Sequence, residues 1–250
     1  MTREQTAIVV GASGAFGRHI AAKLAGEGLK VLAVARSEDG LQSLVSEVPG
    51  VSACAADITS DDAIEAIKGR LDGPVRMIVH GPGVGVAGGI VNVPTEAVSA
   101  SVNIKVGGLL RVVRAADRWL EERSRIVAIG GHYGFEPTAY AACAGIANAA
   151  LSSAVRQLSL ALGPRGITAH LVAPGPADTP RLRRVAADKA AQQGCSVEDV
   201  LDDMRADSSV GKLTTPEQVA WAVANLLAPE ADCMTGSAIM LDSGRRRGLP

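Results

Sequence analysis

Short apolar runs alternate with longer stretches of helical periodicity along the chain. The runs are rich in Val, Ile and Ala, which is typical of buried strands, whereas apolar positions in the intervening stretches recur at helical spacing. We predict strands over residues 7–10, 30–35, 51–55, 75–79, 125–129, 168–172 and 238–241. We predict helices over residues 16–28, 39–48, 61–71, 95–122, 139–163 and 216–228.

Regular alternation of nearly continuous apolar strands with helices favours a parallel sheet that is covered on both faces. The predicted fold class is therefore α/β, with residues 1–250 forming a single Rossmann-type domain. Its doubly wound parallel sheet would have about seven strands with helices on both faces. In such a sheet, ligands bind beyond the carboxyl ends of the strands.

One long segment, residues 174–215, interrupts this alternation. It is polar, it follows the end of a predicted strand, and we expect helices in it over residues 181–193 and 197–206. A long insert at that edge is well placed to act as a lid over a substrate. The alternative is a surface excursion without a role.

Composition and charge narrow the class of protein. With 47% hydrophobic and 20% charged residues, the 250-residue chain can bury a substantial core. A net charge of −1 gives no reason to expect nucleic acid or an anionic membrane as a partner. The longest uncharged stretch, 137–155, lacks the bulky apolar content of a membrane span, and the start of the chain leaves no room for a signal peptide.

The four cysteines lack CxxC spacing, so we expect reduced thiols in a cytoplasmic protein and no metal site. The arginines at 245–247 are interpreted as a solvated terminus.

Three glycines separate the first predicted strand from the first predicted helix. Gly11, Gly14 and Gly17 follow one another at three-residue spacing. Such a turn lets the backbone approach a pyrophosphate, and it points the free N–H groups of the helix N-terminus toward that group. We therefore predict a dinucleotide site here; the alternative is a tight turn that binds nothing.

The end of the second predicted strand indicates which dinucleotide binds. An NAD site has a carboxylate near this point to bond the ribose hydroxyls, but the strand ends in Arg36. Arg18 follows the last glycine, and two guanidinium groups would suit a 2′-phosphate. We therefore expect NADP(H). The alternative is that both arginines are ordinary surface charges, with Glu38 and Asp39 as partners of Arg36.

Taken in order, these motifs resemble the short-chain dehydrogenase/reductase family over essentially the whole chain. The resemblance is carried by the glycine turn, by Asp57 after the third strand, by Asn103, by Pro174-Gly175 with Thr179, and by Asp242-Ser243-Gly244. Two places depart from the family pattern. Ala15 stands where many members have glycine, and His80-Gly81-Pro82-Gly83 replaces an Asn-Asn-Ala-Gly run.

The resemblance implies a set of cofactor-binding residues along the predicted edge. They are Gly11, Ser13, Gly14, Ala15, Phe16, Gly17, Arg18, Arg36, Asp57, Ile58, Gly81, Pro174, Gly175 and Thr179.

The resemblance also implies catalytic residues, and here two expected groups are missing. Tyr140 matches the family's acid/base tyrosine, and Asn103 its water-holding asparagine. The lysine expected four residues after the tyrosine is Ala144, and the expected serine is Gly131, or Gly130. Without a lysine on the same helical face, the tyrosine lacks a nearby charge that favours the phenolate. Loss of positioned acid/base help typically costs about 10² to 10⁴ in rate.

Residues of the loop after the fifth predicted strand could replace the missing lysine and serine. His132 is the best candidate for a donor or proton relay, although a loop histidine without a role is an equal alternative. Tyr133 and Glu136 share its loop and could face the cleft. We assign Tyr140, Asn103 and His132 as the catalytic residues.

Other candidates have plainer interpretations. Cys143 is interpreted as a packed thiol and His80 as a packed histidine close to the cofactor. Lys105 is two residues past Asn103, a spacing that points away from the Asn face, so it is not assigned. The arginines at 181, 183 and 184 open the expected lid and would either meet an anionic substrate or form a solvated face.

Three functions remain in competition. The first is an NADP(H)-dependent oxidoreductase with an altered active site, acting on a carbonyl or another polarised double bond of a small molecule. The second is a non-redox enzyme on the same fold, such as an isomerase, lyase or cyclase. The third is a cofactor-binding protein without turnover. The small residues of helix 139–163 also predict self-association as a homodimer or homotetramer.

Overall fold

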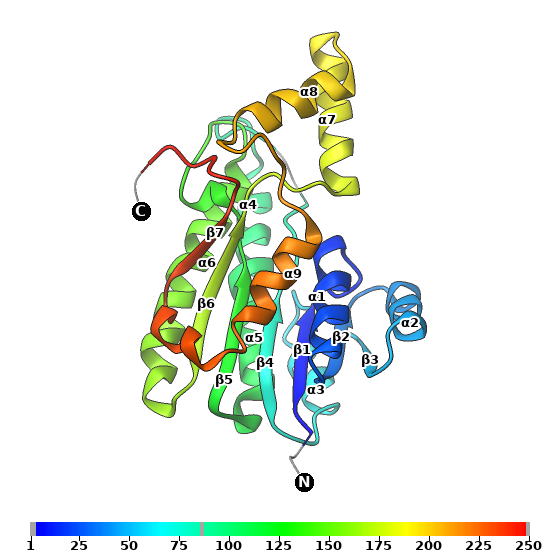
Figure 1. Ribbon diagram of the computed structural model, residues 1–250, viewed down its shortest axis with the longest axis vertical. Coiled ribbons are helices and arrows are strands. Elements are labelled where there is room, and N and C mark those ends of the chain that lie inside the picture. The colour runs from blue at the N-terminus through cyan, green and yellow to red at the C-terminus, as the bar shows by residue number, and fades with distance from the viewer. Residues whose placement is uncertain (1–3, 86–87, 249–250) are drawn as a thin grey trace.

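A seven-stranded parallel sheet forms the centre of the molecule (Figure 1), in a computed structural model that describes residues 4–85 and 88–248. The strand order is β3-β2-β1-β4-β5-β6-β7. The strands are β1 (Thr6–Val10), β2 (Lys30–Ala35), β3 (Val51–Ala55), β4 (Val75–His80), β5 (Leu120–Ile129), β6 (Thr168–Pro174) and β7 (Ala238–Leu241). The order reverses beside β1, so the predicted doubly wound α/β fold is confirmed.

Helices cover both faces of the sheet. The α-helices are α1 (Ala15–Gly26), α2 (Glu38–Glu47), α3 (Asp62–Lys68), α4 (Thr95–Val102), α5 (Gly108–Ala116), α6 (Ala142–Leu162), α7 (Pro180–Gln193), α8 (Val197–Ala206) and α9 (Pro216–Asn225). Shorter turns are η1 (Asn103–Gly107), η2 (Asp117–Trp119), η3 (His132–Gly134), η4 (Gly163–Arg165) and η5 (Pro229–Met234).

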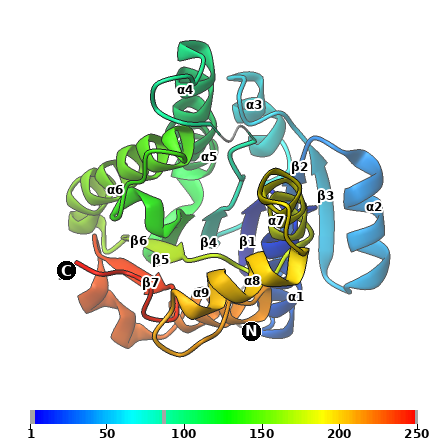
Figure 2. The same cartoon turned by 90° about the horizontal axis from the view of Figure 1, so that it is seen from above.

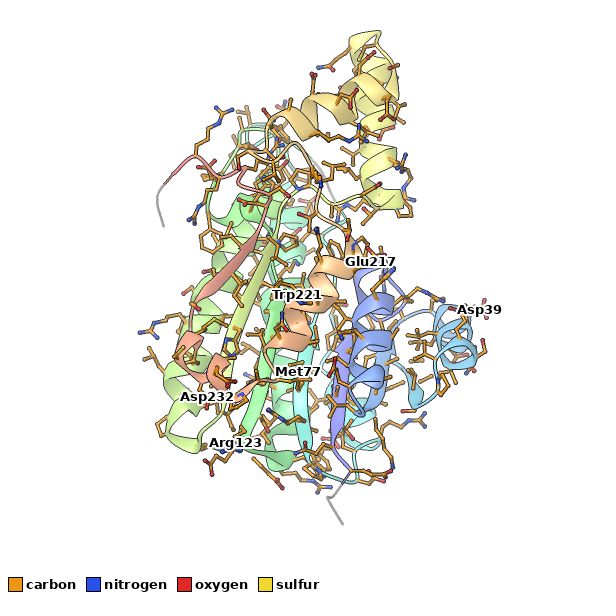
Figure 3. All side chains as sticks on the ribbon, viewed as in Figure 1. Asp39, Met77, Arg123, Glu217, Trp221 and Asp232 are labelled. Atoms are coloured by element: carbon orange, nitrogen blue, oxygen red, sulfur yellow. The ribbon has the colours of Figure 1, made fainter. Side chains whose placement is uncertain are left out.

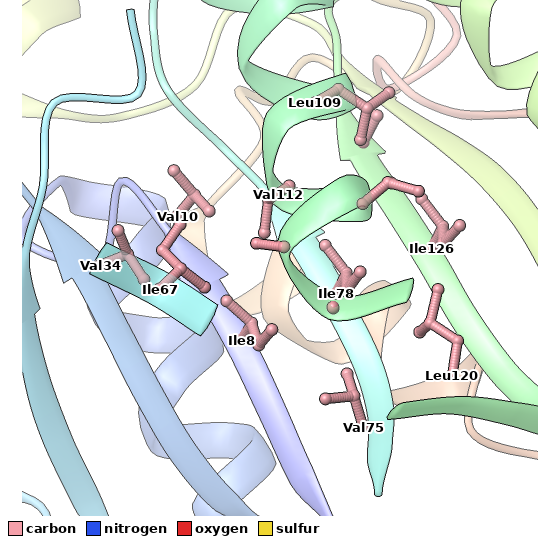
Figure 4. Close-up of a cluster of buried hydrophobic side chains, with 14 of the residues drawn as sticks. Ile8, Val10, Val34, Ile67, Val75, Ile78, Leu109, Val112, Leu120 and Ile126 are labelled. Carbon is pink, nitrogen blue, oxygen red and sulfur yellow. The ribbon is translucent and has the colours of Figure 1, made fainter. Parts of the chain in front are cut away.

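Alternate residues of each strand enter two separate apolar cores. On one face, Ile8 and Ile78 pack with Leu109 of α5 and with residues of α3 and α6 (Figure 4). On the other face, Val9 and Val79 pack with α1, α2 and α9. Burial of both faces explains why the strands lack the apolar–polar alternation of a half-exposed sheet.

The predicted helix over residues 95–122 is wrong in two respects. The structure divides it into α4, the π-helical turn η1, α5 and the 3₁₀ turn η2. Its last residues, from Leu120 onward, belong to β5, which therefore begins five residues before the predicted start at Arg125. A π-turn contains one extra residue and rotates every side chain beyond it, which apolar periodicity does not reveal.

Helices α7 and α8 stand above the carboxyl end of the sheet (Figures 1 and 2). They pack on each other through a small core of their own, which includes Ala186 and Leu201. Thr179 is the N-cap of α7 and Ser196 is the N-cap of α8. The side chain of each accepts a hydrogen bond from a backbone amide of its helix. Among the described residues, no helix has the length and apolar character needed to cross a membrane.

Two arginines bind the end of α9 to the central strands. Arg125 of β5 is buried, and it donates to the carbonyls of Leu226 and Ala228 at 2.7 and 3.2 Å. Arg76 of β4 donates to the carbonyl of Leu227, which lies between these two residues. Arg125 also pairs with Asp232 of η5 at 2.6 Å (Figure 3 labels Asp232). These contacts satisfy the carbonyl groups at the C-terminal end of α9. The dipole of the helix also favours positively charged side chains at this end.

We expect Arg125→Ala to lower the free energy of unfolding by about 3 kcal/mol, because it leaves several buried acceptors without donors. Urea denaturation followed by circular dichroism measures the change. Arg114→Ala, on an exposed position of α5, is the matched control and should shift the value by no more than about 0.5 kcal/mol. Equal stabilities of the two variants would contradict this role of Arg125.

Candidate active site

The glycine turn between β1 and α1 is built around one close backbone contact. A Cβ atom on Gly17 would lie only 2.2 Å from the carbonyl oxygen of Gly11, so no side chain fits there. Gly11 has a φ of 81°, which favours glycine. Gly14 is the N-cap of α1, and no side chain occupies the cap position. The first N–H groups of α1 thus face the carboxyl edge of the sheet, in a cradle suited to a phosphate.

Ser13 and Arg18 of this turn lie against α2. A Cβ atom on Gly40 would lie 2.9 Å from the Cβ of Ser13, so the turn and the start of α2 are in close contact. Arg18 donates to Ser43 and forms an ion pair with Glu47, both on α2. Arg18 therefore has an acidic partner in this structure.

Arg36 differs from Arg18 because, within the described part of the chain, it forms no ion pair or side-chain hydrogen bond. It is exposed directly after β2, and neither Glu38 nor Asp39 pairs with it. Nearby, the side chain of Asp57 accepts from the amide and the hydroxyl of Thr59 at 3.0 and 2.8 Å. These hydrogen bonds, helped by the charge of Arg36, lower the pKa of Asp57, so it is a carboxylate at neutral pH.

The other predicted cofactor residues lie at the ends of neighbouring strands. Ile58 is buried after β3, and Gly81 follows β4, with its amide donating to the Val10 carbonyl at 2.9 Å. Pro174 ends β6, and the amide of Gly175 donates to Leu241 at 2.9 Å. The carboxyl ends of adjacent parallel strands share one edge, so these residues lie along the same edge of the sheet.

Tyr140 is paired with a second tyrosine. Its hydroxyl lies 2.7 Å from that of Tyr133, and the two rings meet edge to face with centroids 5.8 Å apart. Tyr140 is 59% exposed and precedes α6, whereas Tyr133 lies in η3. Burial, followed by the bond to Tyr140, raises the pKa of Tyr133 well above its usual value. Tyr133 therefore stays protonated, and its O–H can donate.

His132 stacks behind this pair instead of facing solvent. It is buried, and its ring centroid lies 4.0 Å from that of Tyr133. Burial, together with the charge of Arg245, lowers the pKa of His132 to about 4. The imidazole is thus neutral at pH 7. It supports the Tyr133 ring, and its assignment as a catalytic residue stays a prediction.

An asparagine occupies the space beside Gly131. A Cβ atom on Gly131 would lie 2.9 Å from Nδ2 of Asn148, a buried residue of α6. The Oδ1 atom of Asn148 has no hydrogen-bond partner among the described residues. A serine at 131 would require movement of this amide. The polar group nearest the missing serine therefore comes from α6.

Asn103 and Lys105 point to opposite sides of the π-turn η1. The Asn103 side chain donates to the Thr59 carbonyl at 3.0 Å and accepts from Arg111 at 2.8 Å. It therefore faces the loop after β3. Lys105 is buried and donates from Nζ to the carbonyl of Ile129, the last residue of β5, at 2.7 Å. The predicted divergence of the two side chains is correct, but Lys105 rather than Asn103 faces the end of β5.

Two further residues have plain structural surroundings. His80 is buried and its Nε2 bonds the Ile104 carbonyl at 3.0 Å. Burial lowers the pKa of His80 to about 3, which keeps the ring neutral. Cys143 is buried in a small cluster with Val84 and Ala147, which agrees with its interpretation as a packed thiol.

The C-terminal tail holds the loop that carries both tyrosines. Glu136 accepts from the amides of Arg247 and Gly248 at 3.0 and 2.9 Å. Arg245 donates to the Met204 carbonyl of α8 at 2.9 Å and pairs with Asp207 at 2.6 Å. The prediction of a solvated terminus is therefore wrong for Arg245, because it connects the tail to α8.

This fold, with a glycine turn and a tyrosine at the same sheet edge, defines a Rossmann-type protein, and comparison with known proteins gives its family. Residues 11–246 match the family model described as enoyl-(acyl carrier protein) reductase. The short-chain reductase protein NovJ of Streptomyces niveus is 27% identical over 98% of this chain and 95% of its own length. The chain belongs to the short-chain dehydrogenase/reductase family of oxidoreductases.

Solved structures agree with this family. An actinorhodin polyketide ketoreductase, solved with NADPH, is 28% identical and matches with a TM-score of 0.87, covering 97% of each chain. BdcA, in complex with NADPH, is 27% identical with a TM-score of 0.83, covering 98% of this chain and 96% of its own.

The sequence did not single out two features of this edge. Asn148 was missed, although an amide side chain among small apolar residues is a polar signal in an apolar context. Lys105 was set aside on the geometry of an α-helix. The pair Gly107-Gly108 was the available signal for an irregular helix at that point.

Proposed function

We propose that this protein is an NADP(H)-dependent oxidoreductase that reduces a carbonyl, or another polarised double bond, of a small molecule. The observation that carries the proposal is the pair of hydroxyl groups of Tyr140 and Tyr133, 2.7 Å apart. The pair presents two O–H groups although the expected serine is absent.

The cofactor assignment is supported by the shape and charge of the cradle. The contact at Gly11 and Gly17 leaves room only for backbone, and the N-terminus of α1 offers free N–H groups. Arg36 is a cation that forms no ion pair among the described residues, and β2 ends without the carboxylate of an NAD site. These residues fit a 2′-phosphate. The two solved relatives described above were both determined with NADPH.

The chemistry follows from the two hydroxyl groups. NADPH, when bound, supplies a hydride to the carbonyl carbon. Tyr140 donates its proton to the carbonyl oxygen, so the C=O bond becomes an alcohol and a phenolate remains on Tyr140. Tyr133 donates a hydrogen bond to that phenolate oxygen and stabilises its charge, until solvent returns a proton.

We assign residues 174–215 as a lid over the substrate. Its helices α7 and α8 stand above the carboxyl edge (Figure 1). The guanidinium of Arg181 reaches the loop after β4, 3.1 Å from where a Cβ on Gly83 would lie. The lid segment rejoins the sheet at Thr214, whose hydroxyl donates to Leu241 of β7. A lid that contacts the loop after β4 as well as β7 would exclude water during hydride transfer.

We expect Arg36→Ala to weaken NADPH binding about tenfold, because one charge-assisted bond to the 2′-phosphate is lost. NADH lacks this phosphate, so its affinity should not change. Fluorescence titration of both nucleotides measures the two dissociation constants. Arg184→Ala is the control for loss of one exposed positive charge. An equal effect on NADPH and NADH would contradict the assignment.

We expect Tyr140→Phe to lower the single-turnover rate of carbonyl reduction about 10²-fold or more, because the proton donor is lost. Tyr133→Phe should lower it less, since that residue only stabilises the phenolate. NADPH affinity should be unchanged in both variants. If the wild type binds NADPH but no member of a panel of carbonyl compounds oxidises it, the protein is a cofactor-binding protein without turnover or a non-redox enzyme.

We also propose a cytoplasmic homodimer or homotetramer that associates through α6. Exposed residues form a stripe along this helix at helical spacing, with Ile146 and Leu160 39% and 62% exposed and Ala149 between them. Light scattering at micromolar concentration should give a dimer or tetramer, and Ala149→Arg should shift it toward monomer. A wild-type monomer would contradict this proposal.

A further inference from the structure

Lys105 is a buried ammonium group at the carboxyl edge of the sheet. Only 4% of the residue is exposed, and one of its three N–H donors is used by the Ile129 carbonyl at 2.7 Å. Within residues 4–85 and 88–248, no carboxylate forms an ion pair with it. Burial of a charged group is unfavourable without compensation, so a buried lysine with free donors and no acid partner is unusual.

The surroundings of Lys105 add positive charge. His80 of β4 and Arg181 of α7 are the titratable groups whose charges couple with it. His80 is neutral, and Arg181 is a second cation above the loop after β4. Burial, together with a smaller contribution from the charge of Arg181, lowers the pKa of Lys105 to about 8. The group is therefore mainly protonated at pH 7, in a place that favours an electron-rich ligand.

The fold fixes this orientation. Asn103 and Lys105 lie two positions apart in the π-turn η1 and point to opposite sides, which leaves Lys105 facing the end of β5. Gly108 permits the close packing, since a Cβ atom there would lie 2.7 Å from Cε1 of His80. The position of the Lys105 side chain is thus set by the backbone of η1.

A dinucleotide that spans this edge has two halves, which lie over the two halves of the sheet. The glycine turn, Arg36 and Asp57 follow β1, β2 and β3, and they define the adenosine side. Lys105 bonds the last residue of β5, on the other side of the switch point. It therefore lies on the nicotinamide side, where α6 has Ala144 in place of the expected lysine.

We propose that Lys105 binds the nicotinamide-ribose half of NADP(H), supplying from η1 the ammonium group that α6 lacks. This inference rests on the proposed function, because it requires that NADP(H) bind at this edge. The free donors of the ammonium group suit the ribose hydroxyl groups. Nothing in it depends on turnover, so binding measurements alone can decide it.

The experiment compares two ligands that share the adenosine half. Lys105→Met keeps the aliphatic stem but removes the charge. We expect its dissociation constant for NADPH to rise about tenfold, with that for 2′,5′-ADP unchanged, because only NADPH carries the nicotinamide ribose. Isothermal titration calorimetry gives both constants. Lys68→Met removes an exposed lysine of α3 and is the control.

A rise confined to NADPH supports the proposal. Unchanged affinity for NADPH, or an equal loss for both ligands, overturns it and leaves Lys105 as a structural donor to Ile129. A wild type that binds neither ligand at millimolar concentration defeats the proposed function instead.

If Lys105→Met does not fold, a pH series on the wild type decides the question. The ammonium is charged below its pKa of about 8 and neutral above it. The affinity for NADPH, relative to 2′,5′-ADP, should therefore fall between pH 7 and 9.5. His80, whose pKa is lowered to about 3, stays neutral throughout this range. A constant ratio would overturn the proposal.

Discussion

The contact between the Gly11 carbonyl and Gly17 is the constraint on which the site depends. It brings α1 so near to the end of β1 that only hydrogen fits between them. Because the helix starts at this point, its free amide groups open onto the same edge at which the other strands end. The register of β1 with β2 and β4 then places Arg36 and Gly81 beside the turn. The absence of a side chain at Gly17 thus determines where a phosphate can bind.

Positive charge is distributed unevenly along this edge. On the adenosine side, Arg18 is neutralised by Glu47, whereas Arg36 has no acidic partner among the described residues. On the opposite side, Lys105 and Arg181 reinforce one another without a carboxylate pair in the described ranges. The tyrosine pair lies on a separate loop, with a neutral histidine behind it. A ligand that brings a phosphate to Arg36 and hydroxyl acceptors to Lys105 would compensate for these positive charges.

Much of this arrangement could be predicted from the sequence, because apolar runs mark the strands and the glycine spacing marks the edge at which the site lies. The seven strands, the glycine turn and the positions of Arg36 and Tyr140 are local signals. The pairing of Tyr133 with Tyr140 depends on how a loop folds back, which no periodicity encodes. Lys105 required knowledge of a π-turn, and Asn148 required knowledge of the space beside Gly131. The boundary between η2 and β5 was missed because Leu120–Glu122 continue a helical pattern.

The C-terminal tail has a practical consequence. Its backbone amides donate to Glu136 on the loop that carries both tyrosines, and Arg245 donates to a carbonyl of α8, so the tail connects this loop to α8. A purification tag added after this tail would disturb the hydrogen bonds of Glu136 and Arg245. The start of β1 lies at the opposite end of the sheet from α7 and α8 (Figure 1). Preparations meant for binding or kinetic work should therefore carry their tag at the N-terminus.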